Sequence, residues 1–259
     1  MRSIIFDPFK DFSAAGYLHN KHGDKDENIV KQFEHNLFRA NLRDAVQYLY
    51  SQSRLTYGDF LQVHSILFSD YYPWAGQDRA ETAPDIAISK AEISFCHPKD
   101  CRRAVEEGLR MGQDIATMNQ KPGEVMGLFA YGHPFLDGNG RTMLLVHIEL
   151  AHRAGFFIAW GQTNKTDYLK ALSDEIKSPG RGILDGYLLQ FKEPSKSRNE
   201  WGNAIMGMKG LDGLDDGNQV DGDLSDPVVA ERYRKFDRQR GYSYVTAGQA
   251  AVQDTSPDK

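Results

Sequence analysis

The segment 133–141 combines a histidine, a carboxylate and a Gly-Asn-Gly-Arg run, which are residue types that phosphate chemistry uses. A helical pattern begins at Asn139 and continues to Ala154, so the run lies at the start of a predicted helix. A helix N-terminus presents unpaired backbone N–H groups and about half a positive charge, which attract phosphate. Gly138 and Gly140 have no Cβ, so phosphate oxygens could approach the backbone closely. We therefore expect a phosphate-binding site here.

The side chains of this segment each fit one part of a transfer reaction at phosphorus. Asn139 adds a donor, and Arg141 adds a guanidinium fork suited to a second phosphate. Asp137 offers an oxygen ligand for Mg²⁺ held between a carboxylate and phosphates, although it could instead only cap the helix. His133 stands before the helix, where its imidazole could take a proton from an attacking hydroxyl. A base, a metal ligand and anion donors together predict phosphate-transfer chemistry.

The elements that must position these residues are mostly helices. Apolar periodicity, proline starts and glycine stops predict helices at about 27–50, 57–68, 98–118, 122–131, 139–154, 165–177 and 182–191. Between 77 and 97, Ile86 and Ile88, and then Ile93 and Phe95, alternate with polar residues. This pattern predicts a short β-hairpin with a turn at 89–92. We expect residues 1–192 to form a mainly α catalytic domain.

The composition changes after Lys192. Residues 193–226 are rich in Gly, Asp, Asn and Ser and contain little apolar surface, which predicts a flexible polar linker. Residues 227–241 could form one short helix, and the end from Thr246 is expected to be disordered. Residues 193–259 are thus predicted to be a linker and tail outside the catalytic domain.

Charge and hydropathy limit the class of protein. The formal net charge of −5 gives no broad electrostatic footprint for nucleic acid. No apolar run approaches the ~18 residues of a membrane span, and the first ten residues do not resemble a secretory signal. Cys96 and Cys101 fit neither a zinc pair nor a disulfide framework, and we expect two reduced thiols in a cytoplasmic protein.

Residues 133–141 resemble the motif His-x-Phe-x-Asp/Glu-Gly-Asn-Gly-Arg of the Fic family of protein AMP-transferases, and they match it at every specified position. The stretches 72–76, 86–90 and 95–98 are similar to the family's approach to, and passage through, a hairpin called the flap. The resemblance covers about 17–192. It implies a Fic-type helical bundle with a short β-hairpin flap, at about 77–97, over the active site.

The resemblance also implies a role for each motif residue. His133 would deprotonate a Tyr, Thr or Ser hydroxyl of a target protein, and Asp137 would hold Mg²⁺ between the α- and β-phosphates of ATP. Asn139, with the backbone N–H groups near Gly138 and Gly140, would form an anion hole for the α-phosphate. Arg141 would hold the β-phosphate. The hydroxyl would attack the α-phosphorus, AMP would be transferred and pyrophosphate would leave.

Two further roles follow from the resemblance. An extended segment of the target would pair its main chain with an open strand edge at Ile86, Ala87, Ile88 and Ser89. Phe135 would point into the core and anchor the loop.

The chain departs from the family pattern at Leu144, where a second arginine would contact the γ-phosphate. The Ser/Thr-x-x-x-Glu-Gly/Asn motif of the family's inhibitory helix is absent from the sequence as well. The donor therefore stays open between ATP and sources of UMP, GMP or phosphocholine, and a non-catalytic peptide-binding module is a further alternative. Regulation stays open between none, weak intrinsic activity and a separate small inhibitory, antitoxin-like protein. Delivery into another cell, the target and the acceptor residue also stay open.

Overall fold

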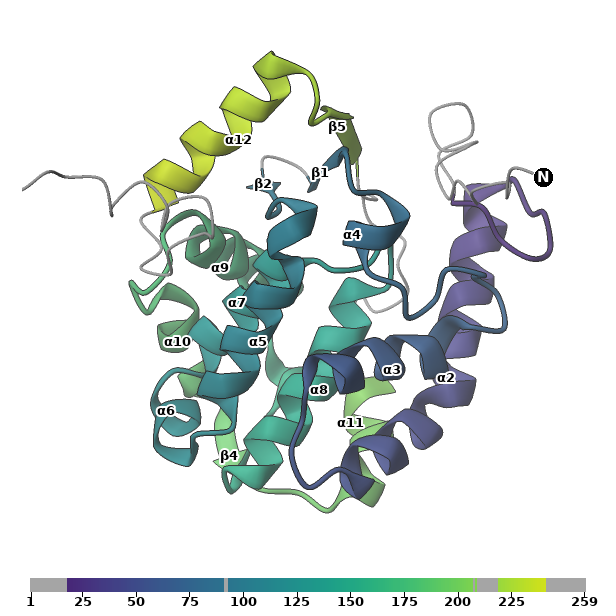
Figure 1. The fold of residues 1–259 in the computed structure, drawn as a ribbon. Coiled ribbons are helices and arrows are strands. Elements are labelled where there is room, and N and C mark those ends of the chain that lie inside the picture. Colours follow the sequence, from purple (N-terminus) through teal and green to yellow (C-terminus); the bar gives the residue numbers. More distant parts are fainter. Residues whose placement is uncertain (1–17, 91–92, 207, 209–218, 241–259) are drawn as a thin grey trace, which may run out of the picture.

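Helices form most of the protein and pack around two adjacent helices, α7 and α8 (Figure 1). The computed structural model describes residues 18–90, 93–206, 208 and 219–240. The helices are α2 (Glu27–Ser51), α3 (Tyr57–Phe68), α4 (Arg79–Thr82), α5 (Cys101–Gly112), α6 (Ile115–Gln120), α7 (Pro122–Gly132), α8 (Asn139–Arg153), α9 (Lys165–Lys177), α10 (Ile183–Leu188), α11 (Arg198–Met206) and α12 (Pro227–Arg240). Short 3₁₀ turns occur at η1 (Pro98–Asp100), η2 (Trp160–Gln162) and η3 (Leu189–Phe191).

Local sequence signals set several of these boundaries. Asp26 caps α2, because its side chain accepts bonds from two backbone N–H groups of the first turn. Thr56 and Asp59 form a reciprocal capping box at the start of α3. The single helix predicted at 98–118 is divided: α5 ends at Gly112, and Asp114 begins α6 as its N-cap, with its side chain accepting from the N–H of Thr117.

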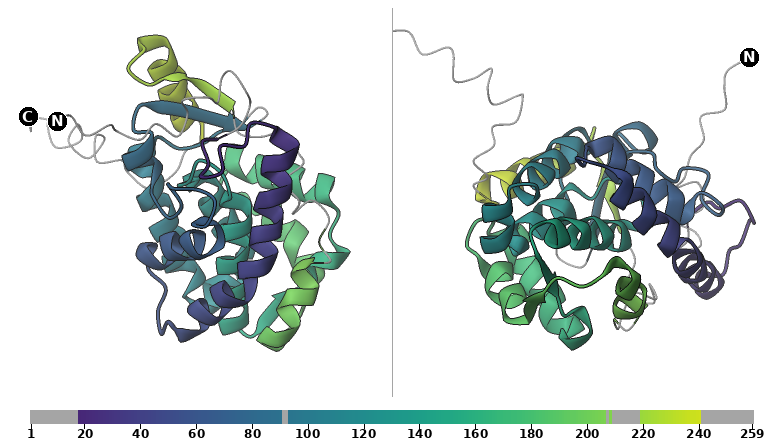
Figure 2. Two further views of the ribbon diagram at one scale, coloured as in Figure 1. Left: turned by 90° about the vertical axis from the view of Figure 1, so that its right-hand side faces the viewer. Right: turned by 90° about the horizontal axis from the view of Figure 1, so that it is seen from below.

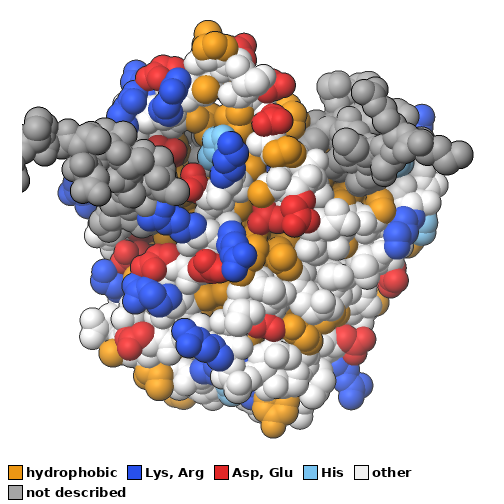
Figure 3. All heavy atoms as spheres, in the orientation of Figure 1, with side chains coloured by type: hydrophobic (Ala, Val, Ile, Leu, Met, Phe, Trp, Pro, Cys, Tyr) orange, Lys and Arg blue, Asp and Glu red, His pale blue; other side chains and the backbone are white. Residues whose placement is uncertain are grey.

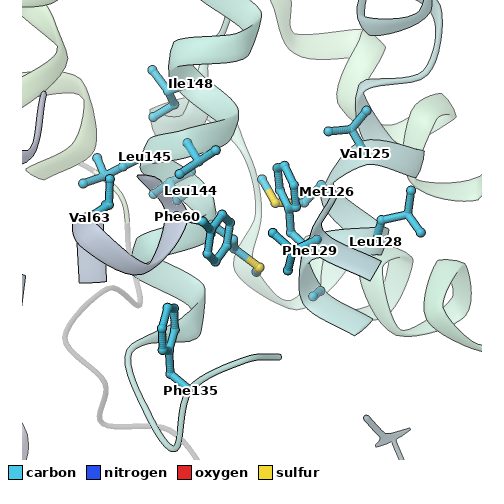
Figure 4. Close-up of a cluster of buried hydrophobic side chains, with 14 of the residues drawn as sticks. Phe60, Val63, Val125, Met126, Leu128, Phe129, Phe135, Leu144, Leu145 and Ile148 are labelled. Atoms are coloured by element: carbon cyan, nitrogen blue, oxygen red, sulfur yellow. The ribbon is translucent and has the colours of Figure 1, made fainter. Parts of the chain in front are cut away.

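The core lies where α8 meets α2, α3 and α7. Most side chains of α8 are buried, and Figure 4 shows Leu144, Leu145 and Ile148 of this helix in one cluster with Phe60 and Val63 of α3 and Phe129 of α7. Burial of apolar surface on this scale is the main stabilising term for such a bundle. The mainly α architecture with a short hairpin is therefore confirmed.

Two small antiparallel sheets complete the described fold. The first has the order β2-β1-β5, formed by β1 (Ile86–Lys90), β2 (Ile93–Ser94) and β5 (Gln219–Asp223). The second joins β3 (Phe156–Ile158) to β4 (Lys192–Pro194). The β1–β2 pairing confirms the predicted hairpin, but the predicted turn at 89–92 is wrong for Ser89 and Lys90, because both residues belong to β1 and pair with β2. Ala91 and Glu92 lie outside the described residues.

The prediction of a flexible linker after Lys192 is wrong for the residues that the structure describes there. Helix α11 packs against α2 and buries Trp201 and Ile205 completely. Strand β5 joins the flap, and α12 contacts both β5 and α9 at one end of the bundle (Figure 2, left). Three buried side chains, Trp201, Ile205 and Tyr233, anchor α11 and α12, although the average composition of this region is polar. The helix predicted at 227–241 is confirmed, and the tail from 241 lies outside the description.

Surface and length features are simple. On the face drawn in Figure 3, basic and acidic side chains are interspersed and form no continuous basic surface. Among the described helices, none combines the length and apolar character that a bilayer span requires.

Candidate active site

The loop between α7 and α8 depends on two left-handed residues. His133 ends α7 with φ 40°, and Gly138 precedes α8 with φ 77°. A Cβ at Gly138 would lie 2.6 Å from the Phe68 ring and 2.9 Å from His64 Nε2, so only glycine fits. At Gly140, by contrast, a Cβ would meet nothing within 4 Å. The two glycines therefore differ: Gly138 is required for packing, and Gly140 borders open space.

The start of α8 lacks a side-chain cap. Its N-cap residue is Gly138, which has no side chain to serve as a cap. Among the backbone N–H groups, Asp137 Oδ1 accepts only from that of Gly138, at 2.6 Å. The alternative that Asp137 is merely the cap of this helix is therefore wrong. The N–H groups of the first turn are left for an anion or water, as the sequence predicted.

Asn139 holds the loop in shape. Its Oδ1 accepts from the N–H of Phe135 at 2.9 Å, and its Nδ2 donates to the carbonyl of Phe135 at 2.7 Å. Phe135 is fully buried and stacks on His64 with a centroid separation of 3.7 Å, so its predicted anchoring role is confirmed. One Nδ2 hydrogen of Asn139 is used in the loop, and its anion-hole role stays a prediction.

His133 is oriented by the flap. Its ring stacks on Phe95 with a centroid separation of 3.5 Å and an interplanar angle of 9°. Its backbone carbonyl accepts from Arg79 Nε at 2.7 Å, and Nη2 of the same arginine donates to the carbonyl of Cys96 at 3.0 Å. Arg79 thus ties the exit of the flap to the motif loop. The sequence analysis missed Arg79, because a buried arginine that serves backbone carbonyls has no motif.

Three charged side chains, Lys31, Glu34 and Arg141, form a cluster with Asp137. Lys31, from α2, donates to Asp137 Oδ2 and lies 3.5 Å from Oε2 of Glu34. Arg141 donates from Nη2 to Oε1 of Glu34, and it lies over the Phe68 ring at 4.7 Å. Lys31 and Glu34 were not predicted from the sequence. They lie more than 100 residues before their partners Asp137 and Arg141, and they approach the motif only through packing of α2 on α8.

These neighbours fix the charge states. Burial raises the pKa of Asp137, but the positive charges of Lys31 and Arg141 outweigh it and hold that pKa well below its ordinary value. Burial lowers the pKa of Lys31, but the negative charges of Asp137 and Glu34 outweigh this effect and hold the pKa above its ordinary range. Lys31 and Asp137 are therefore both ionised at neutral pH.

His64 of α3 supports the loop between α7 and α8. Its Nδ1 accepts from the Gly76 N–H at 2.9 Å, and its Nε2 lies 2.9 Å from the Asp137 carbonyl. Burial lowers the pKa of His64 to about 3, so the ring is neutral at neutral pH. Sequence reasoning missed this residue as well.

The donor set suits Mg²⁺ only when it is bound together with a nucleotide. In the part of the chain that the structure describes, no three His, Cys, Asp or Glu residues form a metal cluster. Asp137 provides one carboxylate, and Mg²⁺ commonly takes one or two carboxylates with substrate phosphates and water. The residues present fit that arrangement.

The predicted strand edge for a target is not open. Ser89, Ile88, Ala87 and Ile86 of β1 pair with residues of β5, and β2 covers the other side at Ser89 and Lys90. Ser89 Oγ also donates to Asp221 at 2.7 Å. The expectation of a free edge is wrong for this state, because a segment from far along the chain occupies it.

Cys96 and Cys101 are both free and buried, as predicted for reduced thiols. Leu144 faces the core (Figure 4), so no cation reaches the site from position 144.

Known proteins are similar to this chain in sequence. Residues 54–151 match the family described as Fic/DOC. The chain is 26% identical over 181 residues to protein adenylyltransferase VbhT of Bartonella schoenbuchensis, covering 64% of this chain but only 35% of VbhT. It is 28% identical over 173 residues to the probable protein adenylyltransferase y4lH of Sinorhizobium fredii, covering 62% of this chain and 84% of that protein.

Solved structures share the fold. BepC of Bartonella tribocorum, solved with bound AMPPNP, superposes with a TM-score of 0.58 at 19% identity over 71% of this chain and 95% of that one. The N-terminal Fic domain of a Bartonella quintana effector, solved with bound ADP, gives 0.58 at 20% identity over 73% and 96%.

Proposed function

Because residues 54–151 form a domain of the Fic/DOC family, we propose that the chain transfers AMP from ATP to a Tyr, Thr or Ser hydroxyl of a target protein. The names of its relatives, protein adenylyltransferases at 26% and 28% identity, support this activity. The bound AMPPNP and ADP of the two Bartonella structures support an adenine nucleotide as co-substrate.

One observation carries the proposal. The Arg141 side chain is only 7% exposed, yet its Nη1 has no hydrogen-bond partner among the described residues. A buried guanidinium donor without an acceptor is costly, and a phosphate oxygen would satisfy it. The uncapped start of α8 and the open space at Gly140 lie on the same turn of helix.

The chemistry follows from the positions of the side chains. His133 takes the proton of the attacking hydroxyl, and the hydroxyl oxygen then forms a bond to the α-phosphorus while pyrophosphate leaves. The amides at Asn139 and Gly140 stabilise the charge on the α-phosphate, and Arg141 holds the β-phosphate. Mg²⁺ bound at Asp137 would supply further charge neutralisation between the phosphates.

Target recognition uses the flap in this proposal. An extended target segment pairs with Ile86, Ala87, Ile88 and Ser89 once β5 has left that edge. The paired edge argues against a simple peptide-binding module, because such a module would present its edge open. We place the activity in a cytoplasm, either that of the producing cell or that of a cell that receives the protein. A separate small inhibitory partner stays a prediction.

Intact-mass spectrometry of the purified full chain tests the proposal. The protein is incubated with Mg²⁺ and, separately, ATP, GTP, UTP, CTP and CDP-choline, with and without a proteome extract as a source of targets. We expect added mass of one AMP on this chain or on an extract protein with ATP alone. His133→Ala should abolish it, and His152→Ala, at the other end of α8, should not. Added mass that appears only with another donor would show that the transferred group is not AMP. The absence of transfer with every donor, with and without extract, would contradict the proposal.

A further inference from the structure

The side chain at position 144 offers no contact to a phosphate. Leu144 is 4% exposed and lies in the core cluster with Phe60 and Leu145 (Figure 4). If a triphosphate binds at the start of α8, its third phosphate therefore needs a cation from another element. Lys31 of α2 is the second described cation in the Asp137 cluster, next to Arg141.

The placement of Lys31 is unusual for a lysine. Its side chain is 11% exposed, and its ammonium group lies between the carboxylates of Asp137 and Glu34. Lysine is seldom buried unless it is paired. Glu34 is fully buried, and its Oε2 has no hydrogen bond in the described structure. The cluster thus holds two cations and two anions, with donor capacity unused at Arg141 and acceptor capacity unused at Glu34.

We propose that Lys31 binds the terminal phosphate of the nucleotide and replaces the arginine that is missing at position 144. The inference rests on the proposed function, because it concerns the same nucleotide. In the described state, Lys31 neutralises Asp137. When a nucleotide with its metal ion engages that carboxylate, the ammonium group exchanges its bond with Asp137 for one with the third phosphate. Glu34 keeps the stem of Lys31 and the guanidinium of Arg141 on the same side.

A simpler role for Lys31 makes a different prediction. As a permanent counter-ion of Asp137 it would affect nucleotides with two and three phosphates equally. If it blocked the carboxylate, its removal would strengthen both. A role at the third phosphate affects ATP far more than ADP. The preference for ATP over ADP therefore separates these roles without reference to catalysis.

The experiment measures binding of ATP and of ADP, each with Mg²⁺, by isothermal titration calorimetry. The full chain carries His133→Ala, so that ATP is not consumed. Lys31→Met should lower the ATP-to-ADP affinity ratio about tenfold, the scale of one charge-assisted bond. Lys31→Gln, which can still bond Asp137, should lower it similarly, and Lys31→Arg should retain it. Arg39→Met, which removes an exposed cation from the same helix, should leave the ratio unchanged. Thermal unfolding confirms that each variant is folded.

The outcomes separate the two proposals. If the parent chain binds ATP but Lys31→Met and Lys31→Gln change ATP and ADP binding equally, or strengthen both, the role of Lys31 is overturned and the proposed function stands. If the parent chain binds neither nucleotide, the proposed function fails, and the inference fails with it.

Discussion

His64 Nε2 donates a hydrogen bond of 2.9 Å to the backbone carbonyl of Asp137, because its Nδ1 is already the acceptor for the N–H of Gly76. This pair of bonds fixes the tautomer of the ring. It joins the turn after α3 to the residue that would hold the metal ion. A histidine without a catalytic role thus determines where the Asp137 backbone lies.

Replacement of His64 by phenylalanine should be strongly destabilising. Phenylalanine keeps the stack on Phe135 but leaves a buried N–H and a buried carbonyl unsatisfied, at about 1–3 kcal/mol each. Chemical denaturation of His64→Phe should therefore show a loss of about 2–6 kcal/mol of unfolding free energy. His152→Phe, which loses one exposed bond to Ser195, serves as the control and should lose much less. Equal losses in the two variants would contradict the role assigned to His64.

The two motif glycines should respond differently to a methyl group. Gly138→Ala places Cβ against Phe68 and His64 at a positive φ, so we expect a loss of about 2 kcal/mol or more of unfolding free energy. Gly140→Ala meets no atom and lies in a helix, where alanine is favoured over glycine by up to about 1 kcal/mol. Its stability should be unchanged or increased, whereas its ATP binding should weaken because the methyl group narrows the approach to the backbone. Stronger ATP binding by Gly140→Ala would exclude a phosphate at that turn.

Stability should fall as the pH is lowered from about 6.5, in part because of His147. Burial lowers its pKa to about 4, and its Nε2 donates to the carbonyl of Pro122 at 2.8 Å. The unfolded chain binds a proton near pH 6.5, but the folded chain does so only near pH 4, so stability is lost as the pH falls between these values. The difference corresponds to at most about 3 kcal/mol. His147→Gln can keep the bond to Pro122 and does not titrate. Its unfolding free energy should therefore change less between pH 7 and 5 than that of the wild type, and identical slopes would refute the assignment.

Loosening β5 should expose the flap. Asp221→Ala removes the bond to Ser89, and Tyr233→Phe removes the bond from its hydroxyl to the carbonyl of Ile88 at 3.0 Å. The double variant should show faster hydrogen exchange at 86–89 and faster His133-dependent transfer of AMP. Arg238→Ala, which breaks an exposed ion pair on α12, is the control and should change neither. Faster exchange without faster transfer would show that β5 does not limit access of the target.

The sequence was sufficient for the features that depend on local pattern. Helix periodicity and glycine or proline boundaries predicted the mainly α fold, and the motif at 133–141 predicted a loop leading into a helix, although the sequence left open whether Asp137 caps it. The alternation of Ile86 and Ile88 predicted the hairpin but not its partner on the other side. Periodicity reports which residues face a core or a sheet neighbour, and it does not identify that neighbour.

The contributions of Lys31, Glu34, His64 and Arg79 could not be predicted, for one physical reason. Each reaches the site from an element remote in sequence, and in the sequence alone each is indistinguishable from an ordinary surface or core residue. The same reason explains why β5 was missed, since Val220 is the one apolar residue of the five and the strand carries no alternating pattern of its own. Such contacts become visible only when long-range packing is known.

Strand β5 is tied to the edge that it covers by the same polypeptide, so it competes with any incoming segment at a high effective concentration. A tethered competitor of this kind commonly acts as if present at millimolar levels. If β5 were docked 99% of the time, the apparent dissociation constant of a target strand would rise about a hundredfold. Any molecule that captured residues 219–240 on another surface would remove this factor and speed modification without touching His133. Selectivity for targets would then be set as much by the chain's own C-terminal region as by the residues that carry out the chemistry.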